Sequence, residues 1–562
     1  MKRKLMALLM AMALCVSMLA GCGAGETGVT TEAPETKEQN NATEGNKEET
    51  SAEVAEEPVK LKVWVKEHLR VDWDDSEMTK WLEEQGNLDL EIEAIPSADY
   101  DTKVNMALTV GDIEDLPDVI IGSWTNSKVW EYAQAETILP LTEYYNDPEA
   151  AVNINDAIER TGTDYTKQII SADGNIYGIA SFNQSYGNEY PDKMWIYKPW
   201  LDALGEEIPT TTEEFYQLLK KVSETDLNGN GKKDEIGLAG DTTTTYGSYF
   251  EYLMNAFVYA GGVDYRLFDE DGTASAAFTT EGWKDGLEYI SKLFDEGLIL
   301  SESLTMDTTQ FKTLLNAEEN VVFAFTYMGA YDSVRSDDYI CIDTLTGPDG
   351  VNWASFEPSS AKVTFMVTAN CENPEAAFRL GDLMSSEKIG ISQRFGWEGI
   401  DWDYAENVKD ISSYVASVDG FDLSIRVYDD NTFWGGSETQ HSSWLQRGPY
   451  VRDYGVANGM AVDPSSMSQT TTNFNEAQVL YQEAARHPEN CPKVLNFTTD
   501  EEEEISDIAT SLKNYVNEFK AGVLSGNIDL EAEWDNYLNE VDKIGLETWL
   551  DVLTAAFARM YK

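Results

Sequence analysis

The sequence predicts a mixed α/β fold with more than one lobe. Three observations support this prediction. Apolar runs after Pro58 alternate between strand-like and helix-like periods, five short elements near the start follow a β-α-β-α-β order, and about 500 residues remain for folded structure. A chain of that length is expected to build two or three domains or lobes.

The first five elements can be placed one by one. The expected elements are a strand at 61–65, a helix at 75–85, a strand at 88–95, a helix at 100–110 and a short buried strand at 118–121. Ligands on open α/β sheets bind outside the carboxyl ends of the strands. The segments 68–73 and 123–128 are therefore predicted to lie near a ligand site.

A later helix carries its own start signal. Thr211 is expected to cap it, with Glu214 three residues on completing a capping box. The apolar residues Phe215, Leu218, Leu219 and Val222 then fall on one face. We interpret this helix as core packing rather than chemistry.

The segment 226–235 follows the spacing of an EF-hand loop. Oxygen side chains stand at positions 1, 3, 5 and 9, and Gly231 stands at position 6, where the loop turns sharply. Position 12, which usually holds a bidentate Glu, is Gly237, so Glu235 at position 10 is the expected substitute. The ion would be calcium, and the alternative is a polar turn without an ion.

Cysteine and histidine usage excludes several kinds of site. Beyond Cys15 and Cys22, only Cys341, Cys371 and Cys491 remain, an odd number without CxxC spacing. The chain has 3 His, none in a metal-binding frame. Histidine-based metal chemistry and a Ser-His-Asp triad are therefore not expected.

The strongly acidic composition limits the choice of partners. The formal net charge is -61, and loss of the three basic residues near the N-terminus makes it -64. Such a surface argues against nucleic acid and against polyanionic ligands such as uronate polymers.

The first 22 residues predict export. Lys2, Arg3 and Lys4 precede an apolar run from Leu5 to Ala20, and the sequence Leu-Ala-Gly-Cys ends at Cys22. This ending resembles the lipobox of bacterial lipoproteins, which implies a signal peptide at 1–21 and a lipid on Cys22. A transmembrane helix is less favoured because the apolar run is shorter than the ~20 residues that span a bilayer.

An acidic tether follows the expected lipid site. Residues 23–58 hold ten Glu, two Lys and no aromatic residue. Such a segment cannot bury enough apolar surface to offset its ordering entropy, so 22–58 is predicted to be disordered.

Several motifs together resemble one known family. The run 195–238 (WIYKPWLDALGEEIPTTTEEF onward), SADGNIYGI at 171–179, EGWKDGLEYISKLFDEGL at 281–298, FGWEGID at 395–401 and the tail 530–558 are similar to the extracellular solute-binding proteins, family 1, of sugar ABC transporters. The resemblance spans most of 59–562. It is closest to the long, calcium-containing subgroup that includes alginate-binding and oligosaccharide-binding proteins.

The resemblance implies a structural calcium ion. Its ligands would be Asp226, Asn228, Asn230, the backbone carbonyl of Lys232, Asp234 and Glu235. In the family this ion lies away from the sugar cleft.

The resemblance also implies a two-lobe, periplasmic-binding-protein-like α/β fold of class II, with the ligand cleft between the lobes. We expect lobe 1 to comprise 59–180 and 368–430, and lobe 2 to comprise 181–367 and 431–562. The chain crossings are expected near 179–186, near 363–368 and within 410–435. Closure of the lobes around a ligand is a hinge motion.

The candidate ligand-binding residues are aromatic and polar side chains in turn-like settings. Trp81, Trp283, Trp534 and Trp549 are set aside as core residues of amphipathic helices. Sugars stack their C–H faces on aromatic rings and hydrogen-bond through their hydroxyls. The candidates are Trp124, Asn126, Tyr186, Tyr246, Tyr327, Trp397, Glu398, Trp402, Trp434 and Arg447.

These inferences predict a non-enzymatic receptor. It would be a monomer anchored by lipid at the extracellular face of a cell membrane, in a Gram-positive organism, and would deliver a neutral oligosaccharide to ABC permease subunits. Two alternatives remain open: a surface glycoside hydrolase, for which no motif assigns a pair of carboxylates, and a receptor of the same fold for a peptide, a polyamine or a modified sugar acid.

Overall fold

The computed structural model describes residues 57–562 apart from 74, 243–246, 331–332, 429–437 and 483–486. The chain divides into two compact units, residues 1–55 and 56–562, and every described residue belongs to the second. The expected signal peptide, Cys22 and nearly all of the tether lie outside the described residues, as do the candidates Tyr246 and Trp434.

A six-stranded sheet forms the core of lobe 1. β1 pairs in parallel with β2 and β3, and β11 is inserted antiparallel between β3 and β4. β15 extends the sheet in parallel beyond β4. The order is β15 (Val451–Arg452), β4 (Ile179–Asn183), β11 (Lys362–Val367), β3 (Val119–Trp124), β1 (Val59–Lys66) and β2 (Leu88–Ile95).

A four-stranded sheet forms the core of lobe 2. β5 pairs antiparallel with β9 and β10, while β6 pairs in parallel with β9. The order is β10 (Tyr339–Ile342), β5 (Met194–Tyr197), β9 (Val322–Thr326) and β6 (Ile236–Ala239). Short two-stranded pairs are formed by β7 (Arg266–Phe268) with β8 (Ala274–Ala276), β12 (Trp402–Tyr404) with β14 (Ile425–Val427), and β13 (Val415–Ala416) with β16 (Ala461–Val462).

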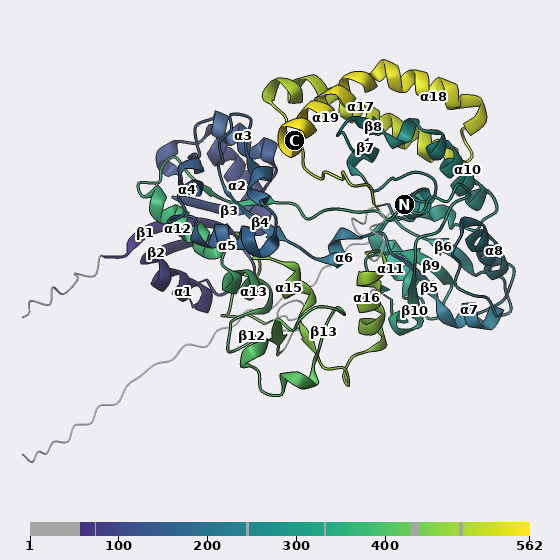
Figure 1. Ribbon diagram of the computed structural model, residues 1–562, viewed down its shortest axis with the longest axis horizontal. Coiled ribbons are helices and arrows are strands. Elements are labelled where there is room, and N and C mark those ends of the chain that lie inside the picture. Colours follow the sequence, from purple (N-terminus) through teal and green to yellow (C-terminus); the bar gives the residue numbers. More distant parts are fainter. Residues whose placement is uncertain (1–56, 74, 243–246, 331–332, 429–437, 483–486) are drawn as a thin grey trace, which may run out of the picture. The chain divides into compact units, whose positions relative to one another are not determined.

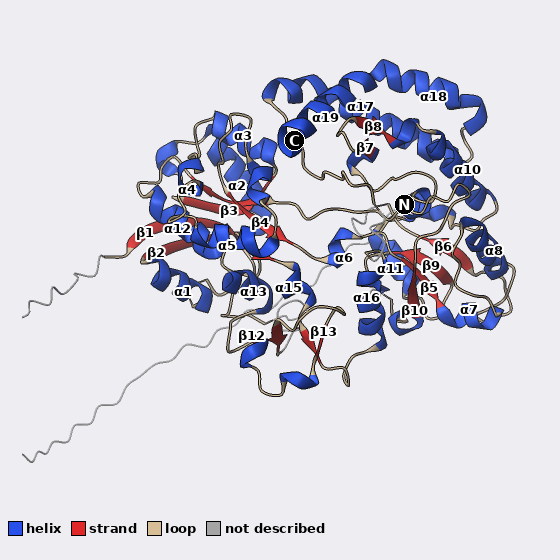
Figure 2. Ribbon diagram, viewed as in Figure 1, coloured by secondary structure: helices blue, strands red, loops and turns tan. Residues whose placement is uncertain are grey.

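Helices flank both main sheets, as Figures 1 and 2 show. They are α1 (Glu77–Gly86), α2 (Ser97–Val110), α3 (Asn126–Gln134), α4 (Thr142–Tyr145), α5 (Val152–Thr161), α6 (Tyr186–Glu189), α7 (Lys198–Leu204), α8 (Thr212–Ser223), α9 (Tyr249–Met254), α10 (Glu281–Asp295), α11 (Thr308–Leu315), α12 (Pro374–Met384), α13 (Glu387–Phe395), α15 (Tyr454–Asn458), α16 (Gln469–Leu480), α17 (Thr499–Leu524), α18 (Leu530–Ile544) and α19 (Leu546–Tyr561).

The sheet of lobe 1 is covered on both faces. In β3, Val119 and Ile121 pack into one core cluster and Ile120 into another on the opposite side. Both faces of this strand are therefore dry, which explains why its sequence is continuously apolar instead of alternating.

The C-terminal helices close the core of lobe 2. α17 and α18 pack against α10, α19 packs against α17 and α18, and Trp283, Trp534 and Trp549 are all buried in this cluster. The prediction that these three tryptophans are core residues is confirmed. Trp81 is only partly buried, against the core of lobe 1.

Most early elements agree with the sequence prediction. β2 has the predicted bounds, and the capping box of α8 is present: Glu214 N donates to Thr211 Oγ1 at 3.2 Å, and Thr211 N donates to Glu214 Oε2 at 3.2 Å. α2 begins at Ser97, directly after Pro96 and earlier than the expected start at 100.

Three segments connect the lobes: 184–193, 343–361 and 453–468. Three expected boundaries differ from this. Residues 181–183 belong to β4 in the sheet of lobe 1, so the first crossing begins at 184. β11 also belongs to the sheet of lobe 1 and not to lobe 2 as expected, and the third crossing follows β15 instead of lying within 410–435. An apolar run shows that a strand is buried but does not show which sheet it joins.

Within the described part of the chain, no helix combines the length and the apolar composition needed to cross a membrane.

Candidate functional site

A cavity of about 300 Å³ lies where the crossing segments meet, and we name it the inter-lobe cavity. Lobe 1 contributes Phe182 of β4, the first crossing contributes Gln184, and the third crossing contributes Tyr454. The remaining lining residues are Thr163, Gln168, Glu189, Phe356, Pro358, Ser359, Glu489, Asn490, Cys491, Pro492, Lys493, Val494, Phe557 and Tyr561.

A larger cavity, of about 990 Å³, lies between α17 and the body of lobe 2, and we name it the α17 cavity. Asp241 and Thr242 follow the carboxyl end of β6 and line it, so it lies at the end of the sheet where ligands bind in α/β proteins. Its volume is at the upper end of the range for small-molecule sites. It has room for a ligand larger than a single sugar ring.

A connected polar network lines the α17 cavity. Asp192 accepts a hydrogen bond from Ser248 N at 2.7 Å. Tyr265 Oη donates to Glu251 Oε1 at 2.8 Å, and Lys520 Nζ donates to Tyr265 Oη at 3.0 Å. Burial and the neighbouring Glu251 raise the pKa of Asp192 to about 7, because both disfavour its charged form.

The charge of the α17 cavity is nearly balanced. Two of its lysines have acidic partners, since Lys513 pairs with Asp264 at 3.1 Å and Lys493 pairs with Glu357 at 2.7 Å. The charged lining residues are Asp192, Asp241, Glu251, Asp264 and Glu357 against Lys362, Lys493, Lys513 and Lys520. Such a lining suits a neutral ligand with many hydroxyl groups better than a polyanion.

Aromatic rings line both cavities. The rings are those of Phe182, Phe356, Tyr454, Phe557 and Tyr561 in the inter-lobe cavity, and Tyr249, Phe250, Tyr265, Phe278 and Trp549 in the α17 cavity. Aromatic faces combined with a few polar groups are the lining that carbohydrate ligands need.

Glu189 joins all three crossing segments. Tyr454 Oη donates to its two carboxylate oxygens at 2.6 and 2.7 Å, and Ser359 Oγ donates at 2.7 Å. The main chain is tied as well, because Glu357 N donates to Glu189 O at 2.8 Å. The side chain is 3% exposed, and burial raises its pKa.

A buried lysine stabilises the first crossing. Lys193 Nζ donates to the carbonyl oxygens of Gly187 and Tyr190, and burial lowers its pKa to about 8. The carbonyls at the end of α6 are thereby satisfied without water.

Two predicted residues lie beside the inter-lobe cavity. Asn126 Nδ2 donates to Gln168 O at 2.6 Å and to Asn496 Oδ1 at 2.8 Å, so it links lobe 1 to the segment before α17. Tyr186 packs on Tyr454, with ring centroids 4.8 Å apart. Neither residue lines the described cavities itself.

Three predicted aromatic residues lie in packed surroundings. Trp124 is 8% exposed and packs with the core of lobe 1, and Tyr327 belongs to a core cluster of lobe 2. Trp402 is fully buried and its Nε1 donates to Gly396 O at 2.8 Å. A fully buried ring offers no free face for stacking on a sugar.

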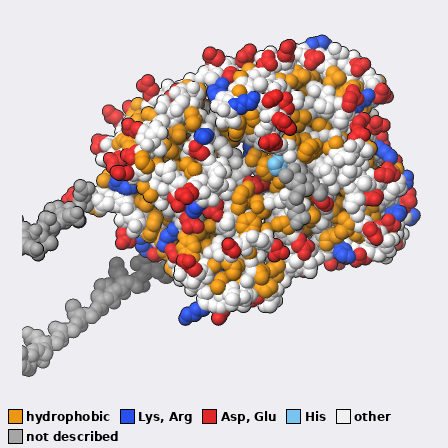
Figure 3. Space-filling view, viewed as in Figure 1, with side chains coloured by type: hydrophobic (Ala, Val, Ile, Leu, Met, Phe, Trp, Pro, Cys, Tyr) orange, Lys and Arg blue, Asp and Glu red, His pale blue; other side chains and the backbone are white. Residues whose placement is uncertain are grey.

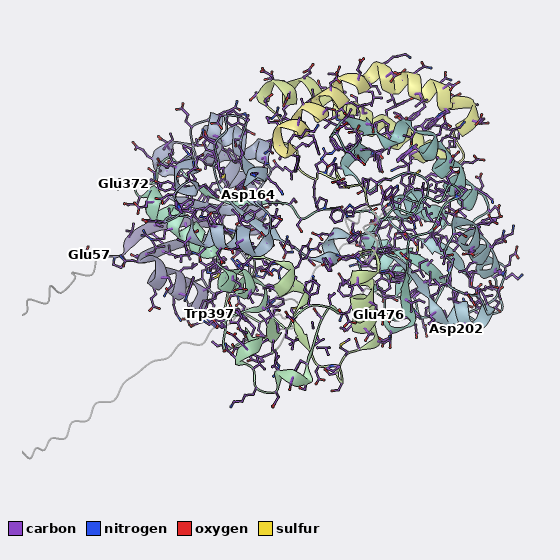
Figure 4. All side chains as sticks on the ribbon, in the orientation of Figure 1. Glu57, Asp164, Asp202, Glu372, Trp397 and Glu476 are labelled. Carbon is purple, nitrogen blue, oxygen red and sulfur yellow. The ribbon has the colours of Figure 1, made fainter. Side chains whose placement is uncertain are left out.

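Trp397 and Glu398 lie together in lobe 1. Figure 4 shows Trp397 near α13 and β12. Lys388 Nζ lies 4.6 Å from the ring centroid of Trp397 and 2.8 Å from Glu398 Oε2. Both candidates therefore already have a partner in Lys388.

Arg447 binds main-chain atoms at the end of β1. Its Nε donates to Lys66 O at 3.0 Å and its Nη2 donates to Glu67 O at 3.5 Å. It therefore lies at the carboxyl end of β1 in the lobe 1 sheet.

The residues that line the cavities were missed by the sequence analysis. Asp192 and Glu189 stand just before the buried strand β5, and Glu251 lies on the short helix α9. The only signal was the presence of two acidic residues next to an apolar strand, which is not specific.

The loop at 226–235 is held by hydrogen bonds among its own polar side chains and backbone amides. Asp226 accepts from Gly229 N and Gly231 N, both at 2.9 Å. Asn230 Nδ2 donates to Asp234 Oδ1 at 3.1 Å. These contacts gather the side chains of the loop around one point.

Glu235 provides the test of whether the loop suits a cation. Its Oε1 accepts from Leu227 N at 2.6 Å and from Asn228 N at 3.0 Å. Its Oε2 is buried and accepts no hydrogen bond from any described residue. A buried carboxylate oxygen without a donor fits a bound cation.

The loop lies before β6, at the end of the sheet opposite to the cavities. Asn230 Nδ2 also donates to Glu319 Oε2 at 3.4 Å, which adds a carboxylate that the spacing did not reveal. In the described chain no cluster of three or more His, Cys, Asp and Glu side chains is arranged to hold a metal. The donors of the loop include two amides and are not such a cluster.

Acidic side chains are scattered over the face of the protein seen in Figure 3 and are more common there than Lys and Arg. This distribution agrees with the net charge of -61.

Comparison with known proteins identifies the family. The sequence model described as "Bacterial extracellular solute-binding protein" matches residues 66–391. The chain belongs to this family. Members of the family are binding proteins, and the two-lobe α/β fold of this solute-binding protein agrees with that assignment.

One curated relative covers most of the chain. The solute-binding protein is 23% identical over 478 residues to the "Fructooligosaccharide ABC transporter substrate-binding protein FusA" of Streptococcus pneumoniae serotype 4, which is 81% of this chain and 82% of FusA.

Solved structures share the fold. A solute-binding protein from Bifidobacterium longum infantis, described as HMO binding and ABC-transporter associated, has a TM-score of 0.72 at 20% identity over 90% of this chain and 99% of that chain. The structure of FusA in complex with kestose has a TM-score of 0.68 at 19% identity, over 89% of this chain and 99% of that chain. The structure of the alginate-binding protein AlgQ2, described as without calcium ion, has a TM-score of 0.62 at 19% identity, over 90% of this chain and 98% of that chain. A further FusA structure is described as an EF-hand mutant.

Proposed function

We propose that this solute-binding protein captures a neutral oligosaccharide outside the cell and delivers it to the permease of an ABC importer. The observation that carries this proposal is the pair of aromatic-lined cavities at the crossing segments, with nearly balanced charge in the larger one. The ligand class of FusA, named for fructooligosaccharides, supports the same choice.

The test is a calorimetric titration of the mature chain, residues 22–562 with Cys22→Ser, against neutral oligosaccharides. The panel holds fructo-, malto-, xylo-, manno-, cello- and galacto-series from disaccharides to hexasaccharides, and the sugars are analysed after each titration. We expect one series to bind with a Kd of about 1 μM or tighter and to be recovered intact.

The other outcomes are informative. Shortened sugars would favour a glycoside hydrolase, for which the acidic side chains in the α17 cavity would be the first residues to examine. No binding in any series would contradict the proposal and favour a receptor for a peptide or a charged ligand.

We further propose that the loop at 226–235 holds a structural calcium ion. The ligands would be Asp226, Asn228, Asn230, the carbonyl of Lys232, Asp234 and Glu235. The buried Oε2 of Glu235, which has no donor among the described residues, supports this assignment. When bound, the ion would neutralise the carboxylates and hold α8 to β6.

We also propose that the chain is a monomeric lipoprotein, anchored through Cys22 at the extracellular face of a Gram-positive cell membrane. The support for this is the sequence of residues 1–58, together with membership of an extracellular family.

We propose the following bounds for the lobes. Lobe 1 comprises residues 57–183 and 362–452, and lobe 2 comprises residues 194–342 and 469–562.

A further inference from the structure

A small space, which we name the neck, shares lining residues with the inter-lobe cavity and with the α17 cavity. A space of about 20 Å³ shares Phe356, Pro358 and Cys491 with the first cavity and Gly261 and Gly262 with the second. A space of that size holds about one water molecule. The two cavities are therefore adjacent, but no sugar ring fits between them in this arrangement.

One ion pair spans the neck. Lys493 lines both cavities and the neck, and Glu357 lines the neck and the α17 cavity. Lys493 Nζ lies 2.7 Å from Glu357 Oε2, and the two side chains are 39% and 42% exposed. An ion pair this exposed adds little stability, because water screens its charges and both long side chains must be held in place.

The backbone on both sides of the neck is held by other contacts. Arg266 Nη2 donates to Pro492 O at 2.7 Å and to Lys493 O at 3.0 Å. On the opposite side the ring of Phe356 stacks on His487, with centroids 3.9 Å apart. The side chains of Lys493 and Glu357 can therefore swing apart while the main chain around them stays in place.

We propose that Lys493 and Glu357 form a gate, and that the ligand is a linear oligosaccharide long enough to pass through the neck and occupy both cavities. This inference rests on the proposed function. A sugar chain in the neck replaces the ion pair with equivalent contacts, since hydroxyl groups accept from Nζ and donate to the carboxylate. Short oligosaccharides fit in one cavity and leave the gate closed.

Two variants with the same charge and different bulk test the gate. Lys493→Met removes the ammonium group and keeps an unbranched side chain, whereas Lys493→Trp fills the neck. Each is titrated with the ladder from disaccharide to hexasaccharide of the inulin-type fructooligosaccharides and of the malto-oligosaccharides. Melting temperatures check the fold, and Lys493→Phe replaces the Trp variant if that variant does not fold.

We expect the wild-type affinity to rise with chain length until both cavities are filled. Lys493→Trp should weaken binding of the longest chains about tenfold more than binding of the shortest, and Lys493→Met, which loses the hydrogen bonds from Nζ but leaves the neck open, should show a clearly smaller difference between long and short chains. A wild-type affinity that does not change with length, or equal effects of Met and Trp, would overturn the gate but not the proposed function. If neither these ladders nor the wider panel binds the wild type, the proposed function fails and the gate with it.

Discussion

Chelation of calcium is expected to lower the melting temperature of the solute-binding protein by about 3 to 4 °C. A ligand present at about 100 to 1,000 times its Kd stabilises the folded state by about 3 to 4 kcal/mol, and removing it loses that amount. The physical reason lies in the loop, where the buried Oε2 of Glu235 has no donor among the described residues. Differential scanning calorimetry with and without EDTA measures the shift.

Glu235→Gln separates the ion from the rest of the loop. The amide oxygen can still accept from Leu227 N and Asn228 N, as Glu235 Oε1 does now. The variant loses the carboxylate that the ion needs, so its melting temperature should no longer respond to EDTA. Glu224→Gln, an exposed acid just before the loop, is the matched control and should respond like the wild type.

The calcium assignment would be contradicted if the wild type showed no shift and bound no calcium in equilibrium dialysis. Sugar affinity should change little in either variant. The loop precedes β6 and is therefore at the opposite end of the strand from Asp241 and the α17 cavity.

Local signals in the sequence predicted the elements of the fold well. Periodicity located β1, β2 and β3, and the Thr211–Glu214 capping box marked the start of α8 within one residue. These features depend on neighbours in the chain, so a single sequence contains them. The lobe boundaries failed at β11, because its partners β3 and β4 lie far away in the sequence.

The candidate site was predicted less well for the same reason. The polar surroundings of Trp402 in the sequence suggest exposure, yet its side chain is fully buried because it packs in a core cluster with Phe395 and Ile425, which are distant from one another in the sequence. The cavity residues come together from segments far apart: Asp192 meets the loop before α9, and Lys493 meets Glu357. The EF-hand-like spacing is visible in a single sequence because all the ligands proposed for the ion lie within ten residues.

Glu189→Ala is expected to destabilise the protein by about 2 to 4 kcal/mol and to weaken sugar binding. Hydrogen bonds to a charged group contribute about 1.5 to 3 kcal/mol each, and the change leaves the hydroxyls of Tyr454 and Ser359 without their acceptor. The three crossing segments also lose the side chain that joins them, so the lobes are held less firmly at the angle that suits the ligand. Urea unfolding and calorimetric titration measure the two effects, and the exposed Glu372→Gln is the control.

The pH dependence of stability separates the effect of the ionisable carboxyl group of Glu189 from the effect of the size and shape of its side chain. Burial raises the pKa of Glu189 in the folded protein above its usual 4.5, so the folded state holds a proton that the unfolded state has already lost. The contribution of this group to stability is therefore fully present below the unfolded pKa and is lost as the pH rises through the folded pKa. Glu189→Gln carries no such proton, so its stability should fall less than that of the wild type between acidic and neutral pH.

Asp192 contributes a pH dependence of the same sign, because its pKa is raised to about 7. Asp192 is present in both the wild type and Glu189→Gln, so its contribution cancels when the stabilities of the two proteins are subtracted. If wild type and Glu189→Gln lost stability equally with rising pH, Glu189 would not hold its proton, and burial would not govern its charge. If Glu189→Ala left both stability and affinity unchanged, the contacts among the three crossings would not set the arrangement of the lobes. The geometry argues otherwise, since a single carboxylate with 3% exposure accepts hydrogen bonds from two crossings while belonging to the third.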